Sequence, residues 1–141
     1  IQICKDVAQF KSFWAFEGLR GLMYASYGLG EYDVAREYMI DAIRIARSMN
    51  AIGWITQCLP AAAVLAAYNG HRERAVELLS LAYHHPRSAT GWLKKFPLIQ
   101  NLQTSLEKDL SSETYSKVWQ RGQTLDLEET ITNLQSQIQN P

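Results

Sequence analysis

The spacing of hydrophobic residues along the chain predicts helices arranged in pairs. Small and apolar residues recur every three or four positions from Gly18 to Leu29, and the same spacing resumes from Ala35 to Ala46. This spacing places side chains on one face of an α-helix. We therefore expect a helical hairpin in this region, with its turn at Gly30.

The pattern repeats after 40 residues, which predicts that the hairpin is a repeating unit. A helix often ends on a glycine in the left-handed conformation, and an alanine where two helices cross lets them approach closely. We expect the repeated glycine and alanine to have these roles. The matching pairs are Trp14 and Trp54, Leu19 and Leu59, Gly30 and Gly70, Ala35 and Ala75, Glu37 and Glu77, and Ala42 and Ala82.

The repeat divides the chain into one all-α domain over residues 1–141. Residues 1–8 are interpreted as the end of a preceding repeat, because the chain begins within an apolar-periodic stretch with no helix-start signal before it. This also suggests a piece of a longer protein. Residues 9–48 and 49–88 are the two clear repeats, and residues 89–141 are a degenerate repeat followed by a C-terminal capping helix.

The C-terminal part has its own helix signals. We expect a helix from about Gly91 to Lys108, a second helix with Ser111 as N-cap, and a third with a capping box between Asp126 and Glu129. The third helix and its neighbour are predicted to cover the preceding hairpin at Leu98, Ile99 and Leu102, through Trp119, Leu127, Ile131 and Leu134.

A proline interrupts the first helix of the second repeat. Pro60 has no backbone N–H, so it removes one hydrogen bond near the middle of that helix. We expect Pro60 to weaken or kink the helix.

The turn and second helix of each unit resemble a tetratricopeptide repeat. The resemblance rests on Gly30-Glu31-Tyr32-Asp33-Val34-Ala35 and on Gly70-His71-Arg72-Glu73-Arg74-Ala75. Each segment is followed by a further alanine, Ala42 or Ala82. The tail from Leu81 to Pro86 and the stretch from Trp119 to Glu129 look like the C-terminal ends of bacterial LuxR-type and STAND-type signalling regulators. The resemblance implies a right-handed α-solenoid that senses or binds a partner within a larger signalling or transcription regulator.

Composition narrows the class of protein further. The chain has 14 basic and 14 acidic residues and no run of like charge, so we expect no direct contact with nucleic acid or anionic membranes. Its longest strongly apolar stretch, Cys58 to Tyr68, is far shorter than the ~20 residues of a membrane span. Two distant cysteines, Cys4 and Cys58, are typical of a reducing compartment, and we place the protein in the cytoplasm.

The sequence offers little sign of catalysis. His71 and His84 stand at opposite ends of a predicted helix about 20 Å long, so they cannot share a metal ion. His84 and His85 are interpreted as residues that close the last helical turn. No catalytic triad or phosphate-binding loop is suggested, and Glu37 and Glu77 are expected on exposed faces. We therefore expect no enzyme activity, no metal and no cofactor.

The first helices of the two repeats carry a second stripe that is our candidate binding site. First helices line the concave surface of tetratricopeptide arrays, so the resemblance implies that this stripe faces a groove. Tyrosine and arginine are common at binding hot spots. The alternative is that the aromatic members pack against repeats upstream. The stripe consists of Phe13, Glu17, Arg20, Tyr24 and Tyr27 in the first repeat and Gln57, Val64 and Tyr68 in the second.

Three functions are compatible with these patterns. The first is a module that binds a protein segment or peptide, or other domains of its own chain, in the groove. The second is a structural cap or self-association arm, which a broad apolar patch around Phe10, Phe13, Trp14 and Phe16 would favour. The third is a small-molecule effector site between repeats, which requires a pocket with a few convergent polar groups.

Overall fold

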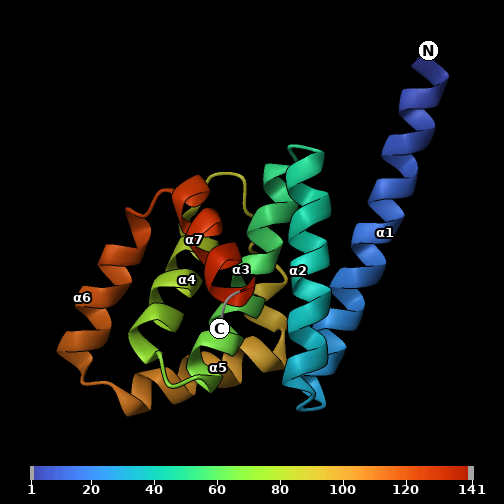
Figure 1. Ribbon diagram of the computed structural model, residues 1–141. Helices are drawn as coiled ribbons and strands as arrows, with labels where there is room; N and C mark the ends of the chain where they lie inside the picture. The colour runs from blue at the N-terminus through green and yellow to red at the C-terminus, as the bar shows by residue number, and fades with distance from the viewer. Residues whose placement is uncertain (1, 140–141) are drawn as a thin grey trace.

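The computed structural model describes residues 2–139, and within that range the chain forms helices and no strand (Figure 1). A single turn of 3-10 helix, η1, lies between the fourth and fifth α-helices. The elements are α1 (Gln2–Gly28), α2 (Tyr32–Ser48), α3 (Ile52–Tyr68), α4 (Arg72–His84), η1 (Leu93–Lys95), α5 (Pro97–Asp109), α6 (Ser112–Gln123) and α7 (Leu127–Gln139).

The first four α-helices form two hairpins, α1 with α2 and α3 with α4, as the 40-residue period predicts. Each hairpin turns on a glycine with positive φ, Gly30 at 79° and Gly70 at 85°, which confirms the left-handed turn positions. Ala35 and Ala75, at the start of the second helices, are fully buried. A side chain larger than methyl there would push the paired helices apart.

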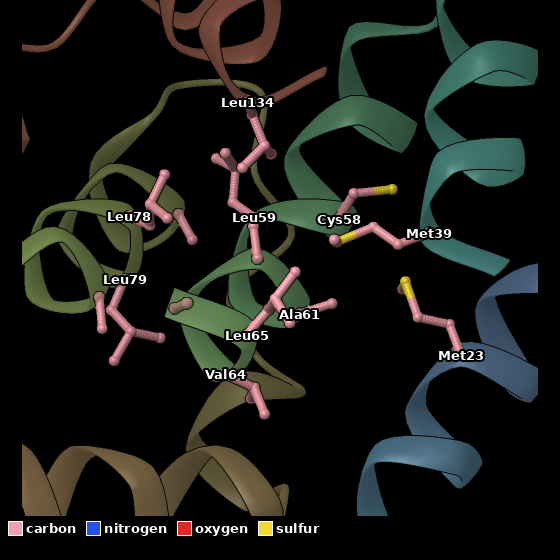
Figure 2. Packing of buried hydrophobic residues seen from close by; sticks show 14 of the residues in the cluster. Met23, Met39, Cys58, Leu59, Ala61, Val64, Leu65, Leu78, Leu79 and Leu134 are labelled. Carbon is pink, nitrogen blue, oxygen red and sulfur yellow. The ribbon is translucent and has the colours of Figure 1, made fainter. Parts of the chain in front are cut away.

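The hydrophobic core is centred on α3. Every residue from Cys58 to Leu65 is buried, including Pro60. Figure 2 shows the side chains of α3 meeting those of α1, α2, α4 and α7 around this helix. The helix is continuous from Ile52 to Tyr68 through Pro60, so the proline does not end it. Its apolar neighbours hold α3 together at the position that lacks a backbone donor.

Helix α6 lies very close to α4. A Cβ at Gly122 would stand 2.6 Å from the backbone oxygen of Glu77 and 2.6 Å from the Cβ of Ser80. The Ser80 hydroxyl donates a hydrogen bond of 2.6 Å to the backbone oxygen of Trp119. Glycine is therefore needed at position 122 because the α4 backbone occupies the space that a side chain would take.

The same contact corrects the expectation for Glu77. Its side chain is 12% exposed and accepts hydrogen bonds from Arg121 Nε at 2.5 Å and Arg74 Nη1 at 2.9 Å. Glu77 is thus not on a free surface, whereas Glu37 is exposed as predicted. The difference arises because α6 folds onto α4, and nothing in the second repeat alone signals that packing.

The third pair of helices differs from the prediction at both its start and its packing. A proline is favoured in the first helical turn and the residue before it is driven to extended backbone, so α5 begins at Pro97 and Phe96 has ψ near 110°. The predicted start near Gly91 was therefore wrong. Helix α6 packs mainly on α4 rather than on α5, so α5 and α6 do not repeat the tight hairpin of the earlier units.

The two predicted N-caps in the C-terminal part are confirmed. The Ser111 side chain accepts a hydrogen bond of 3.1 Å from the Thr114 N–H, and Asp126 accepts one of 2.8 Å from the Glu129 N–H. These bonds satisfy backbone donors that the helices themselves leave unpaired at their N-termini.

The predicted role of α7 as a cap over Leu98, Ile99 and Leu102 was wrong. Helix α7 returns to the first repeat, where Arg47 of α2 donates hydrogen bonds to Glu128 and Gln135. Its apolar face is buried toward α3 and α4, and Figure 2 shows Leu134 beside Leu59. Helix α7 therefore lies with α3 and α4 and not over the last hairpin.

Among the residues that the structure describes, no helix is long and apolar enough to cross a membrane.

We expect Gly122→Ala to lower the stability of the fold by about 1–3 kcal/mol, because the new methyl group overlaps the α4 backbone. The matched control is Gly53→Ala in α3, where a Cβ would stand an ordinary 3.7 Å from the Arg87 oxygen. Urea midpoints of the two variants measure the difference. Equal midpoints would show that α6 does not pack this closely on α4.

Candidate functional site

The eight residues predicted to form one concave stripe do not share one exposed surface. Tyr24, Tyr27 and Val64 are buried, which contradicts their expected place in an open groove. Glu17, Arg20 and Gln57 are partly buried, and Phe13 and Tyr68 are exposed. The prediction of a continuous accessible stripe was therefore wrong at three of its positions.

Tyr24 is buried by the segment that connects α4 and α5. Its ring makes edge-on contacts with Trp92 at 5.5 Å and Phe96 at 5.4 Å, and its hydroxyl donates a hydrogen bond of 2.7 Å to the Gln57 backbone oxygen. Burial raises the pKa of Tyr24 well above its usual value, so the phenol is neutral and acts as a donor. The connection fills the place that a bound segment was expected to occupy.

Tyr27 is buried with an unpaired hydroxyl. No hydrogen-bond partner lies within reach of its Oη, although the side chain is 2% exposed. Burial raises the pKa of Tyr27, and the nearby Arg36 opposes that shift. A buried hydroxyl without a hydrogen-bond partner lowers the stability of the fold. The packing of the Tyr27 ring offsets that cost.

The remaining members of the stripe are held in local pairs. Glu17 and Arg20 form an ion pair of 2.5 Å on α1. Tyr68 stacks face to face on Tyr32, with ring centroids 3.9 Å apart and planes 8° from parallel. The rings of Phe13 and Trp54 are tilted toward each other, with centroids 5.9 Å apart. These contacts divide the predicted stripe into small clusters.

The larger accessible apolar surface is on the opposite side of α1, and we call it the outer face. Its large members are strongly exposed, for example Phe10 at 63%, Trp14 at 58% and Leu29 at 76%. At 3.6 residues per turn it lies opposite the buried side of α1, which contains Phe16, Met23 and Tyr27. The outer face consists of Ile3, Val7, Phe10, Trp14, Gly18, Leu22 and Ala25 of α1 and of Leu29 after it.

The N-terminal half of α1, residues 2–14, projects away from the other helices as an arm (Figure 1), and the base of the arm contacts α3 where Phe13 meets Trp54. On the side of the arm that continues the buried side of α1, the sequence has Lys5, Gln9 and Ser12. The arm is therefore polar toward its own domain, and its outer face is apolar except for Lys11. This polarity is the reverse of what packing against α2 or α3 requires.

The patch considered in the sequence, around Phe10, Phe13, Trp14 and Phe16, is divided by the structure. Phe16 is fully buried and stacks on Trp54 at 4.9 Å. Phe10 and Trp14 are exposed and touch each other edge to face at 6.0 Å. Sequence reasoning recognised these aromatic residues but missed the outer face as a whole, although its signal, apolar residues on two opposite sides of one helix, is present in the sequence.

A cavity of about 630 Å³ lies between α2, α3, α4 and α7. Its apolar wall includes Leu65, Leu78 and Leu134, and its polar groups include Arg36 and Arg74. The Arg36 Nε is buried without a partner, and the nearest carboxylate to its Nη2 is Asp33 at 3.9 Å. Among the described residues the lining contains no carboxylate, so this part of the cavity is basic at one side and apolar at the other. Its full lining is Arg36, Ala62, Leu65, Ala66, Asn69, His71, Arg74, Leu78, Leu134, Gln137 and Ile138.

The histidines are engaged in separate places. His84 Nδ1 is 2.8 Å from the Ser80 backbone oxygen, His85 Nδ1 accepts a hydrogen bond of 3.1 Å from the Arg87 N–H, and His71 lines the cavity. Over residues 2–139, no group of three or more metal-ligating side chains is close enough to hold an ion. The buried Cys58 has its pKa raised to about 12 by burial, which keeps its thiol protonated at neutral pH.

Comparison with known proteins found no match to any protein-family model, curated protein or solved structure.

The two buried tyrosines give opposite expectations for removal of the hydroxyl. Tyr24→Phe loses a buried hydrogen bond to the Gln57 carbonyl, so we expect a loss of about 1–2 kcal/mol. Tyr27→Phe removes an unpaired polar group and should leave stability unchanged or higher. Chemical unfolding curves compare the two. A larger loss for Tyr27→Phe would contradict the described hydrogen bonding.

Proposed function

We propose that this protein is a non-catalytic helical module that binds another protein through the outer face of α1. The observation that carries the proposal is that α1 is apolar on two opposite sides and only one side is covered. A helix that is hydrophobic all round is normally enclosed by other helices. The reversed polarity of the arm supports a partner on the outer side.

The chemistry of the outer face fits a partner helix. It is a row of exposed side chains along a helix that, with 27 residues, is about 40 Å long. Phe10 and Trp14 provide large side chains of the kind found at binding hot spots, while Gly18 and Gly21 leave space for close approach. A partner that presents its own apolar helical stripe would cover the whole face.

The proposal also includes the type of helical array and the larger protein to which the chain would belong. The two hairpins, with the 40-residue period and the glycine turns, support a right-handed tetratricopeptide-like solenoid. The resemblance to bacterial signalling regulators supports a role as a binding or sensing arm in a larger cytoplasmic regulator. In this proposal the binding surface lies at the α1 side of the array, in place of the concave stripe.

We expect Trp14→Glu to abolish capture of protein partners from a cell lysate by the immobilised chain, because a carboxylate in the centre of the outer face would have to be desolvated. Trp14 is exposed and outside the core, so the thermal midpoint of the variant should stay within a few degrees of the original. Quantitative mass spectrometry of the captured proteins measures the effect.

The matched control is Ser105→Glu, which adds the same charge at an exposed position of α5. It should leave capture unchanged. If Trp14→Glu and Ser105→Glu retain the same proteins as the unmodified chain, the outer face is not the binding surface and the proposal fails.

The cavity supports a second candidate function, binding of a small anionic molecule with an apolar chain. Its volume, about 630 Å³, is in the usual range for small-molecule sites of ~300–1,000 Å³. The partly exposed Arg36 guanidinium would donate to a carboxylate, and Leu65 and Leu134 would contact the apolar part. This corresponds to the effector site between repeats that the sequence left open.

Decanoate is a suitable probe of the cavity because it combines a carboxylate with an apolar chain. We expect Arg36→Gln to weaken the binding of decanoate about tenfold or more, because the variant loses a charge-assisted hydrogen bond. Arg44→Gln, an exposed arginine of α2 paired with Asp41 at 2.7 Å, should leave affinity unchanged. Titration calorimetry measures both, and equal affinity for decanol would show that the arginine is not used.

A further inference from the structure

We propose that the partner helix is α1 of a second copy of this chain, with the two α1 helices paired antiparallel over their outer faces. This inference rests on the proposed function and specifies its partner. It is carried by two features of the outer face: a large side chain in one half can lie over an open glycine in the other half, and the exposed apolar area is enough for two copies to associate.

The positions of the outer face are symmetric about residue 16. Ile3 and Leu29, Val7 and Ala25, Phe10 and Leu22, and Trp14 and Gly18 each lie equally far from that position. Two copies running antiparallel therefore place every member of the face opposite another member. A two-fold contact between identical subunits has this property, since residue i meets residue j and residue j meets residue i.

The paired positions also match in size. The arm carries the aromatic side chains Phe10 and Trp14, and the other half of the face carries the small residues Gly18 and Ala25, with Gly21 beside them and opposite Lys11 of the other copy. A Cβ built at Gly18 or Gly21 meets nothing within 4 Å in the described structure, so there is open space over these glycines. In the antiparallel register Trp14 of one copy lies over Gly18 of the other, and a large side chain fills that space.

The geometry of the arm fits this arrangement. The two domains lie on opposite sides of the paired helices, because each domain packs on the buried side of its own α1 (Figure 1). The arm of each copy then lies along residues 18–29 of the other copy. Its apolar side faces that surface, while Lys5, Gln9 and Ser12 stay in water.

The apolar area of the outer face determines how strongly two copies should associate. Phe10 and Trp14 are each more than half exposed, and aromatic side chains of this size bury about 150–250 Å² each. With Ile3, Val7, Leu22 and Leu29, the two copies would bury on the order of 1,000 Å² of apolar surface, near the lower end of specific interfaces. We therefore expect a dimer that dissociates on dilution.

Sedimentation of the purified chain over a wide concentration range tests the proposal. The original chain should shift from monomer to dimer as concentration rises, and Trp14→Glu should stay monomeric at every concentration. Ser105→Glu, with the same charge on α5, should associate like the original chain. A chain that stays monomeric up to millimolar concentration overturns the second-copy proposal.

Gly18→Leu separates the interface from the fold. The space over Gly18 is open in one copy and leucine favours helix, so the monomer should be equally or more stable. In the dimer the leucine side chain would occupy the place of Trp14 from the other copy, so association should fall at least tenfold. Unchanged association of this variant contradicts the proposed register.

Cross-linking in a Cys4→Ser background tests the antiparallel direction, since Cys4 is the exposed native thiol and Cys58 is buried. The double variant Ile3→Cys/Leu29→Cys should be joined into dimers by a short bis-maleimide. The single variant Ile3→Cys should remain unlinked. Efficient linking of the single variant would show a parallel pair and overturn the register.

The two proposals fail differently. A purified chain that is always monomeric, together with lysate capture that Trp14→Glu abolishes, would refute the second copy and retain protein binding by the outer face. Loss of neither property in Trp14→Glu would refute both.

Discussion

A helix that is apolar on every side has to be covered on every side, and α3 is such a helix. Its residues from Cys58 to Leu65 are buried without interruption, so over these residues no face of α3 meets water. The other elements are arranged around that requirement. Helices α1, α2 and α4, the segment with η1 and α5, and helix α7 all pack around α3.

The covering of α3 also decides what becomes of the candidate binding surface. The segment that carries Trp92 and Phe96 closes over Tyr24, so the groove expected along the first helices is filled by the protein itself. Helix α1 has the opposite situation, because its buried side meets α2 and α3 while its outer face is open. The accessible apolar surface therefore lies on the outer face of α1 and not along the stripe predicted from the sequence.

Local signals in the sequence predicted the local structure well. The glycines at 30 and 70, the buried Ala35 and Ala75, and the caps at Ser111 and Asp126 depend on neighbouring residues and were predicted correctly. The positions of α6 and α7 depend on contacts distant in the chain, such as Gly122 against α4, so no period reveals them. The start of α5 was missed although Pro97 marks it. The burial of Tyr24 could not be predicted because the covering segment follows no repeat.

The stack of Tyr32 on Tyr68 joins the two hairpins at the end where their turns lie. Tyr32 follows the first turn and Tyr68 precedes the second, so their parallel rings, 3.9 Å apart, bridge neighbouring units at one edge. At the start of α3 the stack of Phe16 on Trp54, with centroids 4.9 Å apart, makes a second aromatic link between the same two hairpins. The hairpins are therefore joined by stacked rings at both ends of α3, so that bending them apart at either end requires unstacking an aromatic pair.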